Sequence, residues 1–456
     1  MKFFYITPIV ISAVSALVIP ESFKTESFFR PEALAPLLTS STASEHVIPD
    51  QYIIVFKKHV DHAVATEHHS WVSAVHRECV EGLQKRGLES PFLISGLEHG
   101  LKHIYTLTSQ FRGYSGRFDA AVIELIRRHP DVEYVERDSM VYASEADTEK
   151  NAPWGLSRVS HRNALNFGTF NKYLYDTGAG EGVTAYVIDT GINIEHVDFE
   201  GRAVWGKTIP SGDVDQDGNG HGTHCSGTVA GKKYGVAKKA KVVAVKVLKS
   251  NGSGTMSDVI KGVEWAAESH VKESQSGTKG FKGSVANMSL GGGKSPSLDM
   301  AVNAAVELGI HFAVAAGNDN ADACSYSPAA ADKAITVGAS TLGDERAYFS
   351  NYGKCVDIFG PGLNIQSTWI GSKYALNTIS GTSMASPHVA GLLAYFVSLQ
   401  PSSDSEFATA PLTPAKLKAN VLAYGTPDAL SDLPADTPNL LIYNGAGGNL
   451  SDFWSL

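Results

Sequence analysis

The 456-residue sequence lacks an excess of positive charge, and it lacks long apolar runs after its first residues. Lys and Arg number 38 against 47 Asp and Glu, which leaves a formal net charge of −9. A nucleic-acid-binding face needs a domain-scale positive field, so we expect no nucleic-acid partner. No later stretch approaches the roughly 20 apolar residues that cross a bilayer, so we expect no membrane span.

Cysteine is also scarce. The chain has only Cys79, Cys225, Cys324 and Cys355. Residues 1–16 have the pattern of a secretory signal, in which Lys2 precedes an apolar stretch over 3–14 and small residues over 14–16. An N-terminal core strand is the alternative. A secretory chain enters an oxidising compartment where cysteines can pair, and the pairing depends on where the domains divide.

Residues 47–143 are expected to form a small domain with the element order βαββαβ, which is ferredoxin-like. The expected strands are 51–57, 101–107, 111–118 and 132–136, and the expected helices are 60–86 and 119–126, the second capped by Asp119. Five histidines near the first helix favour a solvated face over a metal site, and they are His59, His62, His68, His69 and His76. The polar residues 139–151 are expected to be a linker.

Beyond the linker the pattern alternates between apolar strands and helices. The expected strands are 183–188, 242–247, 285–290, 310–315 and 334–338, and the expected helices include 257–269 and 297–308. Near-continuous apolar strands between helices predict a doubly wound α/β fold, with a mostly parallel sheet covered on both faces. Functional side chains in such folds lie at the carboxyl ends of the strands.

Four polar residues stand at positions that suit a catalytic role: Asp189, His221, Asn318 and, in the next motif, Ser383. Asp189 follows an apolar strand, and a buried carboxylate is costly unless it has a partner. Aspartic-protease chemistry needs two such carboxylates, and the chain has one Asp-Thr-Gly. His221 lies between glycines, with His224 at i+3 and no third metal ligand apparent. Asn318 follows another strand, where its amide could donate to an oxyanion.

Ser383 opens an apolar, helix-compatible segment after a Gly-rich turn, where unpaired N–H groups favour developing negative charge. Asp189, His221 and Ser383 therefore follow one another in the order that subtilisin uses for its acyl-transfer triad. The serine motif is Gly-Thr-Ser-Met-Ala, which disfavours an α/β-hydrolase esterase with its Gly-x-Ser-x-Gly.

Five segments together resemble the subtilisin-like serine proteases. They are Asp189-Thr190-Gly191, His221-Gly222-Thr223-His224, Ser289-Leu290-Gly291-Gly292, Ala316-Gly317-Asn318 and Gly381-Thr382-Ser383-Met384-Ala385-Ser386-Pro387. Cys225, Cys324 and residues 349–353 point to the proteinase K branch, and residues 151–156 are similar to fungal vacuolar members such as cerevisin. The likeness covers about residues 152–445, and residues 47–143 resemble the inhibitory I9-type propeptide of the family.

The resemblance implies a role for each motif residue. Ser383 would be the nucleophile, His221 the general base and Asp189 the group that orients it. The Asn318 side chain and the Ser383 N–H would form the oxyanion hole. The pocket for the P1 side chain would have two small, uncharged walls, which are Ser289, Leu290, Gly291 and Gly292, and Ala315, Ala316 and Gly317. Gly252, Ser253 and Gly254 would pair with extended substrate.

The resemblance also bears on cysteines and metals. Cys324 and Cys355 would form a disulfide, Cys225 would remain a free thiol beside the catalytic histidine, and His224 and His388 would be structural. The chemistry needs no cofactor. Asp357 matches a calcium carboxylate of proteinase K, with main-chain oxygens near Asp332 and Ala334, and an ordinary surface aspartate is the alternative.

These observations predict a serine endopeptidase made as a self-processed zymogen. We expect a signal peptide at 1–16, a propeptide at 17–145 and a catalytic domain at 146–456, with a core at 152–445 and a C-terminal tail that is a candidate for trimming. Its substrates would be proteins and peptides, taken with broad specificity and a preference for bulky apolar or aromatic P1 residues. We expect a monomer in the secretory pathway, in the vacuole rather than outside the cell, with Asn449 as a glycosylation site.

Two other functions remain open at this point. A catalytically inactive homologue could act as a binding module, although Asp189, His221, Asn318 and Ser383 are all present. An esterase or transacylase could use the same residues, and relative rates on peptides and simple esters would separate it from a protease.

Overall fold

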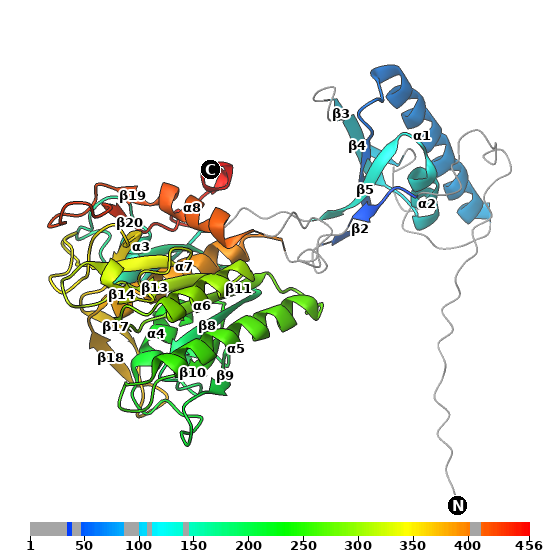
Figure 1. Ribbon diagram of the computed structural model, residues 1–456. Helices are drawn as coiled ribbons and strands as arrows, with labels where there is room; N and C mark the ends of the chain where they lie inside the picture. The colour runs from blue at the N-terminus through cyan, green and yellow to red at the C-terminus, as the bar shows by residue number, and fades with distance from the viewer. Residues whose placement is uncertain (1–33, 39–46, 86–99, 107–111, 140–145, 402–411) are drawn as a thin grey trace, which may run out of the picture. The chain divides into compact units, whose positions relative to one another are not determined.

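The computed structural model describes residues 34–38, 47–85, 100–106, 112–139, 146–401 and 412–456. The chain divides into two compact units, residues 1–141 and 142–456 (Figure 1). The expected signal peptide and the bonds from Tyr142 to Glu145 lie outside the described residues. None of the described helices is long and apolar enough to cross a membrane.

The N-terminal unit has the predicted βαββαβ order. Its elements are β2 (Val47–Phe56), α1 (His62–Lys85), β3 (Leu101–Thr106), β4 (Arg112–Arg117), α2 (Ala120–Arg128) and β5 (Val132–Ser139), preceded by the short β1 (Leu37–Leu38). The sheet order is β1-β5-β2-β4-β3, and all pairs except β1–β5 are antiparallel. As expected, Asp119 caps α2 by accepting a hydrogen bond from the Ala121 N–H.

The expectation of a solvated histidine face on α1 is wrong for two of the histidines. His68 and His76 are buried, with 2% and 1% of their surface exposed, whereas His59 and His62 are exposed. His68 Nε2 lies 3.0 Å from the Tyr114 hydroxyl. Burial holds the pKa of His68 well below its usual value, so this ring packs in the core as a neutral group.

The second unit is built on a nine-stranded sheet in the order β19-β20-β16-β15-β13-β11-β8-β10-β9. The strands are β8 (Val183–Asp189), β9 (Ala203–Thr208), β10 (Lys241–Lys246), β11 (Gly283–Met288), β13 (His311–Ala315), β15 (Ile335–Ser340), β16 (Ile358–Pro361), β19 (Thr426–Pro427) and β20 (Leu440–Leu441). Every pair is parallel except β19–β20, which confirms the predicted α/β architecture.

Helices cover both faces of this sheet. On one face, α5 (Met256–Gln275) and α6 (Pro296–Glu307) run side by side, as Figure 1 shows. On the other face, α4 (His221–Ala230) packs on α7 (Thr382–Ser398). The alternating side chains of β8 divide between the two layers, since Ala185 and Val187 join the α4–α7 core and Tyr186 and Ile188 join the α5–α6 core.

Shorter elements complete the unit. They are β6 (Ala146–Lys150), α3 (Trp154–Val159), β7 (Lys172–Asp176), β12 (Gly292–Gly293), β14 (Tyr326–Ser327), β17 (Ile365–Thr368), β18 (Leu376–Ile379), α8 (Pro414–Tyr424) and α9 (Ser451–Ser455), with 3₁₀ turns at Val197–Phe199 and Ala323–Ser325.

Two segments are more ordered than the sequence predicts. The expected linker 139–151 contains β6, which pairs antiparallel with β7, and Glu149 of β6 forms an ion pair of 2.8 Å with Lys238. The Gly-rich tail after residue 445 contains α9, in which Phe453 is fully buried and stacks on Phe396 of α7 at 4.0 Å between ring centroids. The polar composition of the first segment gave no sign of a strand, and the glycines before α9 gave no sign of a helix in the second.

Candidate active site

The predicted catalytic residues come together at the carboxyl edge of the large sheet. Asp189 ends β8, His221 is the first residue of α4, Ser383 is the second residue of α7, and Asn318 follows β13. Every residue of α7 is buried except Ser383, so the helix is held by its own apolar surface and presents one polar side chain near its N-terminus.

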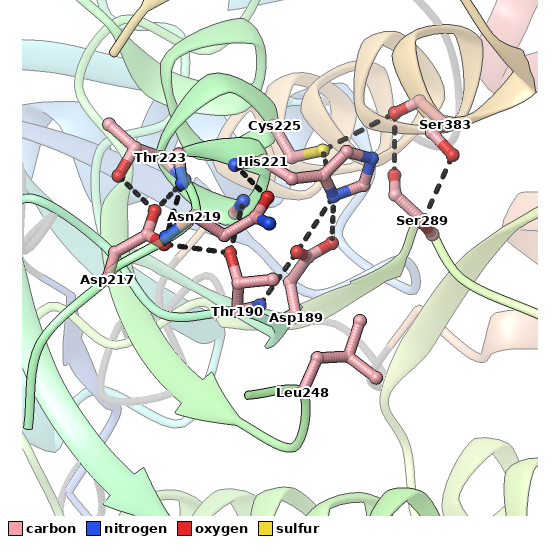
Figure 2. Close-up of polar contacts among 12 residues, drawn as sticks. Asp189, Thr190, Asp217, Asn219, His221, Thr223, Cys225, Leu248, Ser289 and Ser383 are labelled. Carbon is pink, nitrogen blue, oxygen red and sulfur yellow. Dashed lines mark hydrogen bonds and ion pairs between the residues drawn. The ribbon is translucent and has the colours of Figure 1, made fainter. Parts of the chain in front are cut away.

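Asp189 and His221 form a close pair. The His221 Nδ1 lies 2.8 Å from Asp189 Oδ1 and 3.0 Å from Oδ2 (Figure 2). The Asp189 side chain is fully buried and also accepts a hydrogen bond from the Thr190 N–H at 2.7 Å. With Nδ1 held by the carboxylate, the neutral imidazole carries its proton there and leaves Nε2 free to accept another.

The environment of His221 favours its protonated form. Burial by itself lowers the pKa of His221, but the Asp189 carboxylate opposes it, and the pKa is raised well above the usual 6.5. An imidazole of raised basicity accepts a proton readily from a neighbouring hydroxyl. The same carboxylate stabilises the imidazolium that results.

Ser383 is held by contacts on both its hydroxyl and its carbonyl. Its Oγ donates to the Ser289 carbonyl at 3.1 Å, and within the described residues no hydrogen bond joins Oγ to His221. Pro387 lacks an N–H, so the Ser383 carbonyl has no donor in the helix, and Ser289 Oγ donates to it at 2.7 Å instead. Catalytic hydrogen bonds often tighten only when substrate binds.

The two predicted oxyanion donors converge on one point. A β-carbon built on Gly381 would lie 3.5 Å from both Asn318 Nδ2 and the Ser383 backbone nitrogen. Asn318 Oδ1 accepts from the Thr382 N–H at 2.8 Å and the Thr382 hydroxyl at 2.9 Å, which fixes the amide with Nδ2 toward this point. Gly381 therefore leaves a space in which an oxygen could accept two hydrogen bonds.

A residue that sequence reasoning missed ties the aspartate and histidine segments together. Asp217 is only 3% exposed and accepts five hydrogen bonds, which are shown in part in Figure 2. Their donors are Thr190 Oγ1 at 2.9 Å, Asn219 N at 3.0 Å, Gly220 N at 2.9 Å, Thr223 N at 3.0 Å and Thr223 Oγ1 at 2.6 Å. Thr190 follows Asp189, and Gly220 precedes His221, so one carboxylate positions both.

Cys225 lies directly behind the pair as a fully buried free thiol. Its Sγ lies 4.0 Å from His221 Nδ1 and donates to the Ser383 carbonyl at 3.4 Å. Asp189, His221 and Cys225 are the one cluster of metal-ligand types among the described residues. Burial raises the pKa of Cys225, which favours the neutral thiol, and Asp189 already holds His221 Nδ1. The cluster therefore fits a hydrogen-bonded aspartate–histidine pair with a thiol beside it better than a metal site.

A cleft of about 480 Å³ begins beside His221. It brings together the predicted substrate segments Gly252–Gly254 and Ser289–Gly292, and Leu248, Met256 and Val259 add apolar lining. No Asp, Glu, Lys or Arg lines it. Ala315, Ala316 and Gly317 are not among its lining residues. Ala315 ends β13, Ala316 and Gly317 follow it, and the Gly317 N–H donates to Thr382 Oγ1.

The two histidines that were predicted to be structural are both buried. His224 Nε2 lies 2.9 Å from the Ile365 carbonyl and His388 Nδ1 lies 2.8 Å from the Met384 carbonyl, and burial lowers the pKa of each ring to about 4. Cys324 and Cys355 form the predicted disulfide. Asn449 is exposed, and its glycosylation stays a prediction.

Two families of known proteins match the two units. Residues 180–426 match the subtilase family, and residues 51–144 match peptidase inhibitor I9. The subtilase match lies within the second unit, and the I9 match covers the N-terminal unit from residue 51 and extends three residues past its boundary at 141.

Individual relatives match over almost the whole chain. The subtilisin-like serine protease Pen c 2 of Penicillium citrinum is 66% identical over 91% of this chain and 92% of its own. The subtilisin-like serine protease Cla h 9.0101 of Davidiella tassiana is 66% identical over 91% of this chain and 81% of its own. A crystal structure of a cold adapted subtilisin-like serine proteinase matches with a TM-score of 0.57 and 44% identity, over 65% of this chain and 99% of that chain.

Proposed function

Because the chain belongs to the subtilase family of serine proteases and carries an I9 propeptide, we propose that it is a self-processed endopeptidase of the secretory pathway with a preference for bulky apolar or aromatic P1 residues. The observation that carries this proposal is the convergence of Asp189, His221 and Ser383 beside the two donors at Gly381. Broad specificity is proposed because extended substrate would be held largely through its backbone.

The chemistry proceeds through an acyl-enzyme. Ser383 Oγ attacks the scissile carbonyl carbon while its proton passes to His221 Nε2. The carbonyl oxygen becomes an oxyanion that accepts hydrogen bonds from Asn318 Nδ2 and the Ser383 N–H. His221 then gives the proton to the leaving amine, the peptide bond breaks, and water repeats the sequence to release the acid and restore Ser383.

The P1 preference is supported by the residues predicted to form the P1 pocket. Of its two walls, Ser289–Gly292 lines the cleft and Ala315–Gly317 does not, and neither wall carries a carboxylate to pair with a Lys or Arg side chain. A charged P1 residue would lose its hydration without gaining a partner. A bulky apolar residue would instead gain burial, which contributes about 1.5–3 kcal/mol for a fully buried side chain.

A panel of peptides that differ only at P1 tests this preference. We expect kcat/KM for Phe and Leu to exceed that for Lys and Glu by about tenfold or more, since each 1.4 kcal/mol of transition-state binding is a factor of ten. The Ser383→Ala variant is the control for contaminating proteases. Equal or higher rates with Lys or Glu at P1 would refute the preference and leave the protease assignment intact.

The propeptide is proposed to inhibit the enzyme until it removes itself. The cleavage is expected between about Ala143 and Asn151, at a bond such as Tyr142–Ala143 or Ser144–Glu145. Either of these two bonds precedes β6 and would leave its ladder with β7 intact in the mature enzyme. We propose a monomeric mature enzyme in the vacuole, with secretion as the alternative, since its relatives are fungal subtilisin-like proteases.

A further inference from the structure

Three oxygen atoms surround the side-chain nitrogen of Lys418, away from the catalytic centre. The Lys418 Nζ lies 3.0 Å from the Asp332 carbonyl, 2.6 Å from the Ala334 carbonyl and 2.9 Å from Asp357 Oδ2. We refer to these three oxygens as the oxygen cradle. A lysine ammonium has three N–H donors and no acceptor, so three acceptors satisfy it completely.

The oxygen cradle is the place where the family resemblance implies calcium. The residues present do not fit that ion. Calcium binds oxygen ligands at about 2.3–2.6 Å, so an ion at this position would lie against the ammonium that these same oxygens already hold. Two cations at such a distance repel strongly, and the single carboxylate of Asp357 could not balance both.

The surroundings hold the oxygen cradle in this arrangement. Asp357 Oδ2 also accepts from the Thr336 N–H at 2.8 Å, and the Asp357 N–H donates to the Thr336 carbonyl at 2.9 Å. The Asp332 side chain accepts from Asn303 Nδ2 at 2.6 Å, and it is the Asp332 carbonyl that accepts from Lys418. Lys418 and Asp357 are 19% and 24% exposed, so the pair is partly shielded from water.

Through its position in α8, Lys418 links two parts of the fold that are far apart in the sequence. Lys418 belongs to α8, whereas the oxygen cradle belongs to the segment that enters β15 and to the start of β16. The ammonium thus joins a late helix to the sheet. A metal ion at this point could join only the segments that supply its ligands.

We propose that the Lys418 ammonium is the resident cation of the oxygen cradle, and that it makes the stability of the mature enzyme independent of calcium at this position. Lys418→Ala should then have two effects. It leaves Asp357 without its charged partner, and it opens a space in which calcium and water can reach all three oxygens.

The test compares thermal unfolding of mature enzyme, inhibited at Ser383 by a serine-directed reagent, in millimolar calcium and in chelator. Lys416→Ala is the matched control, because Lys416 is exposed on the same helix. In each buffer, wild type and Lys416→Ala should have the same Tm as each other, and any calcium response of the wild type should persist in Asp357→Asn. Lys418→Ala should unfold at least about 5 °C lower in chelator and regain part of that loss in calcium.

Several outcomes would overturn the proposal. A calcium response of the wild type that disappears in Asp357→Asn would mean that calcium displaces the lysine. Lys418→Ala as stable as Lys416→Ala in chelator would mean that the ammonium contributes nothing. A destabilised Lys418→Ala that gains nothing from calcium would mean that the three oxygens do not form a cation site.

Discussion

Asp217→Asn tests whether a buried carboxylate outside the triad positions the triad. Asp217 Oδ1 accepts from Thr190, Asn219 and Gly220, and Oδ2 accepts twice from Thr223. An asparagine keeps one oxygen and replaces the other with an NH₂ group. Whichever way the amide turns, that NH₂ faces at least one backbone N–H from which it cannot accept, whereas a threonine hydroxyl can reverse and accept from the NH₂.

The size of the effect follows from the hydrogen bond that the backbone N–H of Thr223 loses in the less costly orientation. A hydrogen bond to a charged group contributes about 1.5–3 kcal/mol, so the free energy of unfolding should fall by at least that amount. The rate should fall as well, because the segments carrying Asp189 and His221 lose their common support. A displacement of about 1 Å costs on the order of 10² in rate, so we expect kcat to fall about 10²-fold with little change in KM.

The assay pairs peptide hydrolysis with denaturant unfolding of the inhibited mature enzyme. Titration of active serines corrects the rate for any misfolded fraction. Asp215→Asn is the control: it makes the same change two residues away, at an exposed side chain that accepts from Thr208 Oγ1. We expect that control to change neither kcat nor stability by a measurable amount.

Two results would refute the reasoning. If kcat per titrated serine equals that of wild type while stability falls, Asp217 supports the fold and does not position the catalytic pair. If neither quantity changes, the buried hydrogen bonds to Asp217 are replaced without cost.

Three further predictions concern the oxyanion hole, the disulfide and acid stability. Asn318→Ala should lower kcat by about 10²–10³ with KM nearly unchanged in steady-state kinetics, and an unaltered kcat would exclude its role as oxyanion donor. Cys324 and Cys355 are 31 residues apart, so replacing both by Ser should lower the free energy of unfolding by about 3–4 kcal/mol in denaturant titrations; no loss would argue against the chain-entropy account. His224 and His388 stay neutral in the folded state down to a pKa of about 4, whereas in the unfolded chain they take up protons below 6.5. The contribution of these two histidines to stability should therefore be full above pH 6.5 and fall toward pH 4, by up to about 3 kcal/mol for each, and His388→Gln should reduce this dependence in unfolding measured across that range.

The order of the triad could be predicted because few residue types suit each role and because parallel sheets bring strand ends to one edge. Asp189 and Asn318 follow apolar strands, and Ser383 opens an apolar helix, so each carries a local signal. The βαββαβ order of the N-terminal unit could also be predicted, because its strands and helices differ in composition.

Other features have no local signal. Asp217 stands near Asp213 and Asp215 in a polar loop, and only the fold distinguishes the buried carboxylate from its exposed neighbour Asp215. Lys418 reaches oxygens more than sixty positions earlier in the chain, and helix periodicity says nothing of that contact. Glu149 likewise looks like a linker residue until β6 is seen to pair with β7.

The most direct test of the account is the intact mass of the purified full chain and of its Ser383→Ala variant. We predict that the wild type loses roughly its first 145 residues by cutting itself, and that the variant retains them, because Ser383 is the nucleophile of both processing and hydrolysis. A variant trimmed like the wild type would show that another protease matures the chain. A wild type that stays uncut and leaves an Ala-Ala-Pro-Phe peptide intact would contradict the central claim.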